Sequence, residues 1–417
     1  MRFRMAVLIL AIFCVGTAEL APSGMLTDLS RDLSVTVPTA GLLVTVYALT
    51  VVFGGPLVTA ASTRVRRKYL LVALLLVSVA GNVLSSFAPT FGVLVAGRML
   101  TAVIHGTFLA VCVVTAGSMA AKGKEGSAVA GTQLGINLAT VLGVPLGTLV
   151  AQQLNWRATF GGVAVLAAVA VVLILLVIPD DGGTAGSSAA HELRVFKKWQ
   201  VLGTVLATVL CSGGMFTLIT YMVPLLTDVG GFPSAWVPAV LVAYGLGSIV
   251  GNAIGGRIAN RSVDTAVLAL SWTLAAVCLL YWAAAPSAVG AAVFLVLFSI
   301  ATFALIPGLQ TKVLSAAADA PTLSLTANMS AFGLGAALGS WAGGQLIDQG
   351  FGTRAVTLGA AAFTALGALL IAQTVYVGRR GTPGSTGTPG TSGSTSGSRP
   401  AGDVPRAEAG TTVSPTP

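Results

Sequence analysis

Three ionisable side chains lie inside long apolar stretches of the sequence: Glu19, Arg98 and His105. A carboxylate at the centre of a bilayer helix costs roughly 2.5–3.5 kcal/mol on insertion scales, so such a group has a partner or a function. Glu19 and Arg98 lie at similar depths and can meet. A spacing of seven residues, two helical turns, places His105 on the face of Arg98. We predict that these residues couple proton movement to another process, with Glu19 as the group that binds and releases the proton.

Two structural interpretations compete with this prediction. Glu19 and Arg98 can form an ion pair that only stabilises the fold. A lone buried histidine such as His105 is in turn more often a packed core residue than a proton relay. The sequence alone leaves these alternatives open.

A second group of residues is suited to contact a small molecule. Gln133 and Asn137 share one helical face by their i,i+4 spacing, and buried amides in a membrane either line a cavity or bond across helices. From the second half of the chain we select a mainly apolar wall with two polar groups, as expected for a drug-like ligand. Its members are Met215, Phe216, Tyr221 and Asn328.

The composition is that of a membrane protein, with 55% hydrophobic residues, 8% charged residues and a mean hydropathy of +0.91. The formal charge of +9 does not indicate nucleic-acid binding, because the basic residues flank apolar segments. All four cysteines fall in apolar segments without a CxxC spacing, so we interpret them as packing residues.

A window of about 19 residues predicts twelve membrane-spanning helices. Basic residues concentrate in the termini and in the even-numbered connections, for example "RVRRK" at 64–68, so both termini are predicted to be cytoplasmic. The predicted spans are 5–26, 39–62, 69–88, 91–119, 127–151, 159–178, 201–225, 236–257, 264–284, 287–309, 322–347 and 354–377.

Internal repeats divide the chain into two halves. "LTD" followed by a Val-Pro pair recurs at an offset of 200 residues, and Tyr47 matches Tyr244 at an offset of 197. The predicted organisation is all-α: two pseudo-symmetric six-helix bundles joined by a cytoplasmic linker, and a disordered cytoplasmic tail rich in Gly, Ser, Thr and Pro. The boundaries are 1–178, 179–200, 201–378 and 379–417.

Glycines recur at intervals of four, as in Gly143/Gly147 and Gly251/Gly255, and allow close helix packing. Pro145 interrupts the fifth predicted span, where we expect a local bend.

Several motifs occur in a fixed order along the spans. They are "GGPLVTAASTRVRRK" (54–68), "GRMLTAVIHGTF" (97–108), "GVPLG" (143–147), "NWRATF" (155–160), "TYMVPLLTDVGGF" (220–232) and "GNAIGGRIANR" (251–261). On these motifs, residues 4–378 resemble the major facilitator superfamily, and within it the twelve-helix drug/proton antiporters near the chloramphenicol-efflux and arabinose- or purine-efflux permeases.

The resemblance implies a set of gating and helix-packing residues in these motifs. This set comprises Gly54, Gly55, Arg64, Arg67, Gly143, Pro145, Gly147, Gly251, Gly255, Arg257 and Arg261. Thr59 or a neighbour stands where many members of the family carry Asp.

We therefore expect a secondary transporter of the plasma or inner membrane that exports a small, hydrophobic or drug-like molecule in exchange for protons by alternating access. A sugar or nucleoside/purine exporter of the same fold is the alternative, and a non-transporting receptor a further one. With two histidines and no HExxH, GxSxG or Walker A motif, an enzyme is not expected. The expected partners are the substrate, protons and lipid, without nucleic acid, metal or cofactor, and the expected state is a monomer.

Overall fold

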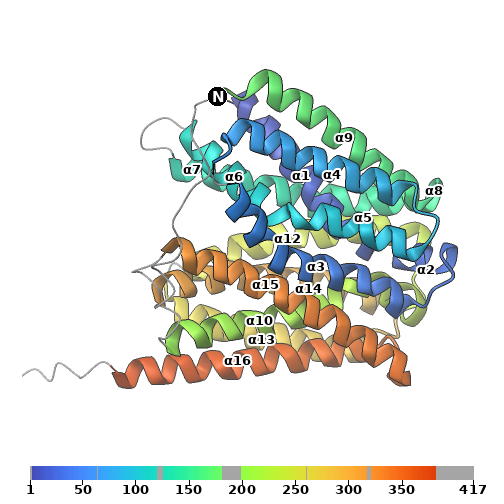
Figure 1. Cartoon of the computed structure of the whole chain (residues 1–417). Coiled ribbons are helices and arrows are strands. Elements are labelled where there is room, and N and C mark those ends of the chain that lie inside the picture. Colours follow the sequence, from blue (N-terminus) through green and yellow to red (C-terminus); the bar gives the residue numbers. More distant parts are fainter. Residues whose placement is uncertain are drawn as a thin grey trace, which may run out of the picture.

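The computed structural model describes residues 2–62, 64–119, 125–180, 199–259, 261–316 and 321–381. These residues form helices joined by short connections (Figure 1). The main helices of the first half are α1 (Arg2–Gly24), α2 (Leu26–Asp32), α3 (Val37–Ala61), α4 (Arg67–Ser86), α5 (Phe91–Val103), α6 (His105–Ser118), α7 (Glu125–Leu138), η1 (Ala139–Gly143), α8 (Val144–Gln153) and α9 (Trp156–Val177).

The second half continues the same pattern. Its elements are α10 (Trp199–Thr220), α11 (Met222–Pro224), η3 (Leu225–Val229), η4 (Ser234–Trp236), α12 (Val237–Ala259), α13 (Val263–Ala284), α14 (Ala288–Ala316), α15 (Pro321–Leu346), η5 (Ile347–Phe351) and α16 (Ala355–Gly381). Most of the predicted linker and the tail beyond residue 381 lie outside the described residues.

Within the described residues, eleven helices are long and apolar enough to cross a membrane. These helices coincide with eleven of the predicted spans. Two of them consist of several elements in series: α5 and α6 together form one span, and α7, η1 and α8 together form another. The predicted span 322–347 falls on α15, a helix of 26 residues that is not among the eleven. The predicted all-helical membrane architecture is confirmed, whereas the number twelve stays a prediction.

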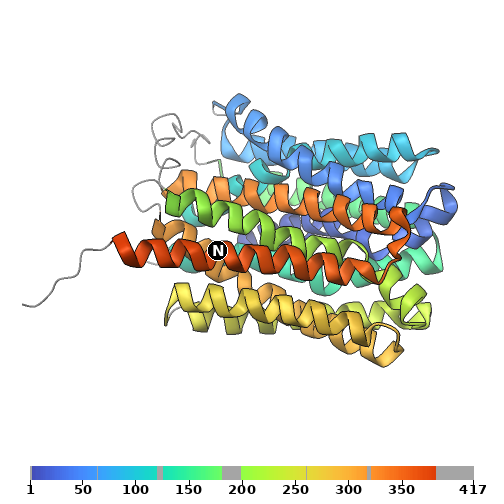
Figure 2. The ribbon, with the colours of Figure 1, turned by 90° about the horizontal axis from the view of Figure 1, so that it is seen from below.

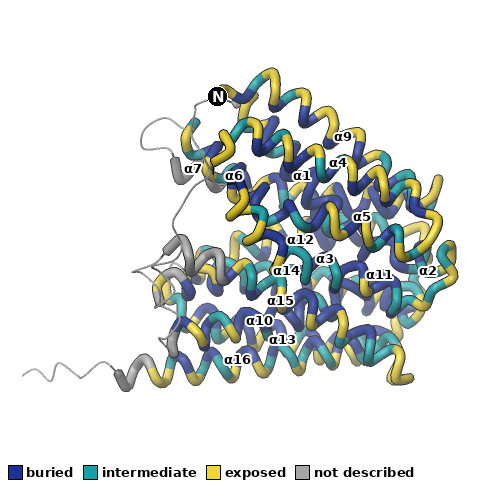
Figure 3. The backbone as a smooth tube through the Cα atoms, in the orientation of Figure 1, coloured by how far each residue is buried: buried dark blue, intermediate teal, exposed yellow. Residues whose placement is uncertain are grey.

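Burial follows the pattern expected of a membrane protein. Large apolar side chains are exposed on the outward faces of the bundle, for example Leu76 on α4 and Val165 on α9, and Figure 3 shows exposed positions along these faces. In lipid such side chains remain in an apolar environment, so their exposure is not destabilising. Buried residues concentrate where the helices pack against one another.

The N-terminal end of α1 and the C-terminal end of α16 lie at the same end of the bundle (Figure 1). We call this the terminal end, and the opposite end, which carries α2, the α2 end. α2 follows α1 directly and packs on α3 and α11. Glu19 lies five residues before the last residue of α1, and so nearer the α2 end than the predicted span 5–26 implied.

Helices of the two halves of the chain meet along two seams. In one seam α3 packs against α15 (Figures 1 and 2), and in the other η1 and α8 pack against α12. Glycines allow the close approach: Gly245 of α12 faces the backbone of Val141, and Gly333 of α15 faces Val52.

The fifth span is irregular next to Pro145. A π-helical turn, η1, ends two residues before Pro145, whose nitrogen cannot donate a backbone hydrogen bond. The bend expected at Pro145 stays a prediction. The π-helical turn packs on α1 on one side and on α12 on the other, so it joins the Glu19 helix to a seam.

Candidate functional site

Glu19, His105 and Tyr47 form a chain of polar contacts between α1, α6 and α3. The carboxylate Oε2 of Glu19 lies 3.6 Å from Nε2 of His105, and Nδ1 of the same imidazole is 2.9 Å from the Tyr47 hydroxyl. His105 and Tyr47 are buried, but 31% of the Glu19 side chain is exposed. The carboxylate is thus the member of these three that solvent can reach.

Arg98 reaches this cluster from α5. It is 1% exposed, and its guanidinium carbon lies 4.5 Å from the ring centre of Tyr47 and 5.6 Å from that of Phe160. Nη2 donates to the backbone carbonyl of Glu19 over 3.4 Å, whereas Nε and Nη1 have no hydrogen-bond partner in the described part of the chain. The guanidinium is held mainly by aromatic faces.

The structure therefore brings together the three residues selected as proton-coupling candidates, but their pairing differs from the simplest expectation. Arg98 contacts the main chain of Glu19, and the basic side chain within ion-pair distance of the carboxylate is His105. The stacking of Arg98 on Tyr47 explains why the guanidinium does not extend to the carboxylate.

Local packing fixes each member of the cluster. Gly81 and Gly97 oppose each other and bring α4 and α5 into close contact around Arg98. Helix α1 is held by the small residues of α7 and η1, because Gly135 packs on Ile12 and Gly143 on Thr17. His105 begins α6 directly after the break at Ile104.

Tyr47 was not selected from the sequence. Its match with Tyr244 in the repeat was a usable signal, but a tyrosine in an apolar span has no spacing that distinguishes a hydrogen-bonding role from packing. Only the fold places it between Arg98 and His105.

The residues selected for a substrate cavity fall in different environments. Gln133 is exposed, and Asn137 and Phe216 are half-buried. Met215 is buried in the core of the second half, and Asn328 is buried and accepts a hydrogen bond from Thr208 over 3.0 Å. The structure does not gather all six around Glu19, and their role in binding stays a prediction.

Tyr221 lies in the α3–α15 seam and is fully buried. Its hydroxyl donates to the carbonyl of Ser340 over 3.1 Å, and the Ser340 hydroxyl donates to the carbonyl of Gly41 over 3.1 Å. A Cβ at Gly41, Gly343 or Gly344 would overlap the Tyr221 side chain. These contacts close the seam at the α2 end.

The glycines of the motifs serve close packing. Gly54 faces Val103, and the carbonyl of Gly55 accepts hydrogen bonds from Thr59 and Thr107. In the fifth span, the carbonyl of Gly147 accepts a hydrogen bond from the Thr159 hydroxyl, and Pro145 is buried. On α12, Gly251 and Gly255 face the backbone of α14. Among the motif arginines, three are exposed and one is half-buried: Arg64, Arg257 and Arg261 are exposed, and Arg67 is half-buried.

At the terminal end two ion pairs were missed in the sequence. Arg66 contacts Asp180 over 2.8 Å, and the nearly buried ammonium of Lys312 on α14 contacts Asp264 at the start of α13 over 2.5 Å. Each pair joins two segments of the same half of the chain: the Arg66 pair lies between residues that flank α4 and α9, and the Lys312 pair joins α14 to α13.

A cluster at the α2 end fixes α2 to its neighbours. Asp32 accepts hydrogen bonds from the Trp156 indole over 3.0 Å and from Arg157, which also donates to the carbonyl of Ala88 over 3.0 Å. The hydrogen bond from Arg157, aided by that from Trp156, holds the pKa of Asp32 below its usual value.

This pKa predicts a pH-dependent stability. Because the folded-state pKa is depressed, the stabilisation is present above the unfolded pKa of about 3.9 and is lost as pH falls through the folded value. Asp32→Asn is expected to lower the unfolding free energy at pH 7 by about 1 kcal/mol at most, since the pair is partly exposed. Thermal unfolding of purified protein at pH 3–8 measures this. Asp348→Asn, at an exposed acid without such contacts, is the control, and an Asp32→Asn effect that does not shrink in acid contradicts the assignment.

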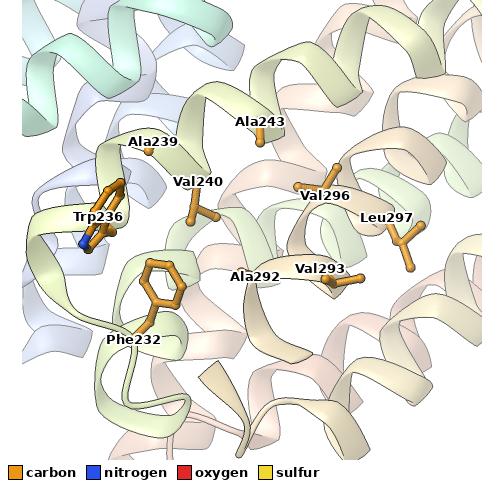
Figure 4. Close-up of a pocket in the computed structure, with 9 residues that line it drawn as sticks. All are labelled: Phe232, Trp236, Ala239, Val240, Ala243, Ala292, Val293, Val296 and Leu297. Carbon is orange, nitrogen blue, oxygen red and sulfur yellow. The ribbon is translucent and has the colours of Figure 1, made fainter. Parts of the chain in front are cut away.

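An apolar groove of about 470 Å³ lies between the α2-end turns of α12 and α14 (Figure 4). Phe232, Trp236 and Val293 are among its lining residues, all of which are apolar, and none belongs to the Glu19 cluster. Within the described residues no three His, Cys, Asp or Glu side chains lie close enough together to hold a metal ion.

Comparisons with known proteins agree with this architecture. The sequence profile of the Major Facilitator Superfamily matches residues 8–327. The "Inner membrane transport protein YdhP" of Escherichia coli K12 is 37% identical over 89% of this chain and 96% of its own length. The "Chloramphenicol resistance protein" of Streptomyces lividans is 34% identical over 80% of this chain and 86% of its own length. The "Putative transporter AraJ" of E. coli K12 is 29% identical over 87% of this chain and 93% of its own length.

Helices that cross the membrane many times and an ionisable cluster buried among them define a polytopic membrane protein of the transporter class. The chain belongs to the major facilitator superfamily. The resemblance seen in the motifs is thereby confirmed, as is the placement in a cell membrane.

Proposed function

We propose that this protein is a proton-coupled exporter of a small, hydrophobic or drug-like molecule. The observation that carries the proposal is the partly exposed carboxylate of Glu19 beside His105, in a bundle where such a group has to be functional or paired. Proton binding at Glu19 alters its interaction with His105, and so alters the relative stability of the two states of the transporter.

Access to Glu19 differs between the two ends of the bundle. At the α2 end the seams are closed by Tyr221 and Ser340 and by the hydrogen bond from Gln152 to the carbonyl of Ser234, 3.0 Å long. Toward the terminal end, Gln133 is exposed and Asn137 is half-buried. These contacts support a state in which Glu19 is reached from the terminal end.

The proposed topology has twelve spans in two six-helix bundles, with both termini in the cytoplasm. The 26-residue helix α15 supplies the twelfth span, because its position beside α3 and α10 is that of a helix inside the bundle. With the terminal end cytoplasmic, the state described above faces inward and can load a substrate for export.

The proposed substrate class rests on the chemistry of the residues selected from the sequence and on one relative. Apart from the ionisable Glu19, Arg98 and His105, the selected residues are amides, apolar groups and a phenol, which suits an uncharged amphipathic molecule. One relative carries chloramphenicol resistance in its name. A sugar or nucleoside/purine exporter of the same fold remains the second candidate, because the motifs also resemble those of arabinose- or purine-efflux permeases.

The test is transport by the purified protein in proteoliposomes with an imposed pH gradient. Amphenicols, sugars and purines are offered in turn, and a pH-sensitive dye in the lumen reports proton movement. Substrate-dependent proton flux supports the proposal. Transport without proton movement refutes the coupling, and the absence of transport together with retained ligand binding favours a receptor.

The Tyr47–His105 hydrogen bond allows a narrower prediction. When the Tyr47 hydroxyl donates to Nδ1, Nε2 of His105 carries the proton and faces Glu19. Tyr47→Phe keeps the ring beneath Arg98 but removes this donor. Loss of one hydrogen bond of about 0.5–1.5 kcal/mol predicts a roughly 2- to 12-fold lower export rate and a shifted pH profile. Tyr244→Phe, its counterpart in the repeat, is the control, and an unchanged pH profile in Tyr47→Phe contradicts the role.

A further inference from the structure

Two contacts relate the fifth span to α12 and to η4, the short turn directly before α12. Gln152 contacts Ser234 through a hydrogen bond, and Val141 faces Gly245. Along the fifth span, Gln152 lies eleven residues after Val141. Along the other segment, their partners run in the opposite order, because Ser234 lies eleven residues before Gly245. The two segments therefore run antiparallel with equal spacing between the two contacts.

Continuing this register toward the terminal end brings amides of the two halves to the same level. Gln133 reaches the level of residue 253, and Asn137 reaches the level of residue 249. Asn252 lies between these levels, on the face of α12 that carries Gly245 two turns earlier. All three amides therefore lie along the terminal-end part of the seam, where none of their side chains is fully buried.

None of the three amides has a hydrogen-bond partner within the described residues, and none is buried: Gln133 is exposed, and Asn137 and Asn252 are half-buried. The flanking positions Leu134 and Leu138 are exposed apolar residues suited to lipid. Amides inside a membrane span require water or a partner, and in the described part of the chain these three have no partner.

We infer that Gln133, Asn137 and Asn252 form a terminal-end gate, in which their amides hydrogen-bond across the seam when the α2 end opens. An amide can both donate and accept, so three of them form an uncharged network without a further residue. The gate holds the alternate state of the transporter closed toward the terminal end. The inference rests on the proposed function, because it assumes that the two halves rock about their seams.

Cysteine cross-linking in intact membranes tests the gate. One variant carries Gln133→Cys with Asn252→Cys, and a second carries Gln152→Cys with Ser234→Cys at the α2 end. The four native cysteines are buried, which keeps background reaction low. Each pair is examined in the native sequence and with Gly41→Ala, which weakens closure at the α2 end because a Cβ there would overlap Tyr221.

With Gly41→Ala we expect cross-linking of the 133–252 pair to rise about tenfold and that of the 152–234 pair to fall. Leu134→Cys with Asn252→Cys is the matched control, since Leu134 has the same depth on a different face, and it is expected not to rise. Where Gly41→Ala does not reach the membrane, Tyr221→Phe replaces it, because it removes the hydrogen bond to Ser340.

The outcomes separate the gate from the proposed function. If the 152–234 pair responds and the 133–252 pair does not, the gate is wrong while rocking of the halves stands. If the control pair rises as strongly as the 133–252 pair, the amide face has no special place in the seam and the gate is again refuted. If neither pair responds, both the gate and alternating access fail, whereas cross-linking as expected without proton flux in proteoliposomes refutes only the proton coupling.

Discussion

Replacing Glu19 with glutamine is expected to abolish uphill export while leaving the protein folded in the membrane. Glutamine keeps the length of the side chain, and the backbone carbonyl that accepts from Arg98 is unaffected. What is lost is the ability to alternate between a charged and a neutral form opposite His105. Substrate accumulation driven by a pH gradient should fall to the level of empty vesicles, whereas exchange of substrate across the membrane without a gradient can persist.

The measurement is export and lumenal pH in proteoliposomes, at equal protein level. Asp28→Asn is the matched control, because Asp28 is also a carboxylate but lies in α2, outside the cluster, and it should leave export unchanged. Full proton-coupled export by Glu19→Gln would show that Glu19 is structural, and His105 would become the candidate for coupling.

Introducing a single methyl group at Gly41 is expected to shift the protein toward the state open at the α2 end. The new Cβ would overlap the phenol of Tyr221, and Gly41 also supplies the carbonyl that accepts from Ser340. Overpacking typically costs about 1–3 kcal/mol, which corresponds to a roughly 5- to 150-fold change in the ratio of the two states. Export should fall because loading from the terminal end becomes rare.

This shift can be measured by labelling a cysteine at position 45. Thr45 is buried one turn beyond Gly41, so a membrane-impermeant maleimide applied at the α2 end labels Thr45→Cys only when that end opens. Gly106→Ala is the control, because it brings the same gain in helix propensity at a position where a Cβ meets nothing within 4 Å. Equal labelling in the two backgrounds would mean that Gly41 does not control closure.

The spans could be predicted because hydropathy depends on local composition alone. Eleven predicted segments coincide with membrane-capable helices, and the remaining segment, α15, is a helix in which glycine, serine and asparagine lower the hydropathy. Those same small residues let α15 approach α3 and α10, so close packing explains the weaker signal.

Periodicity placed Arg98 and His105 on one face, but it could not choose between competing partners. Opposite charges predict a pair between Arg98 and Glu19, whereas the aromatic faces of Tyr47 and Phe160 hold the guanidinium. Those rings come from α3 and α9, and only the folded bundle brings them to α5.

Tyr221 shows a second limit of the sequence. Its type and position favour a cavity wall, yet the absence of side chains at Gly41, Gly343 and Gly344 creates a slot that encloses its ring. The Asp32 cluster was missed for a related reason, since Trp156 and Arg157 are more than 120 residues away in the chain.

The seal at the α2 end is built from hydroxyl-to-carbonyl and amide-to-carbonyl hydrogen bonds. Among the described residues no ion pair joins α3 to α15 or α8 to α12. Salt therefore has little to screen when this seal opens, and no group within it changes charge at physiological pH. Closure of the α2 end and the proposed response to protons thus depend on different parts of the molecule. The hydrogen bonds of the seal depend little on pH and ionic strength, and the proposed sensitivity to the proton gradient comes from the Glu19 cluster.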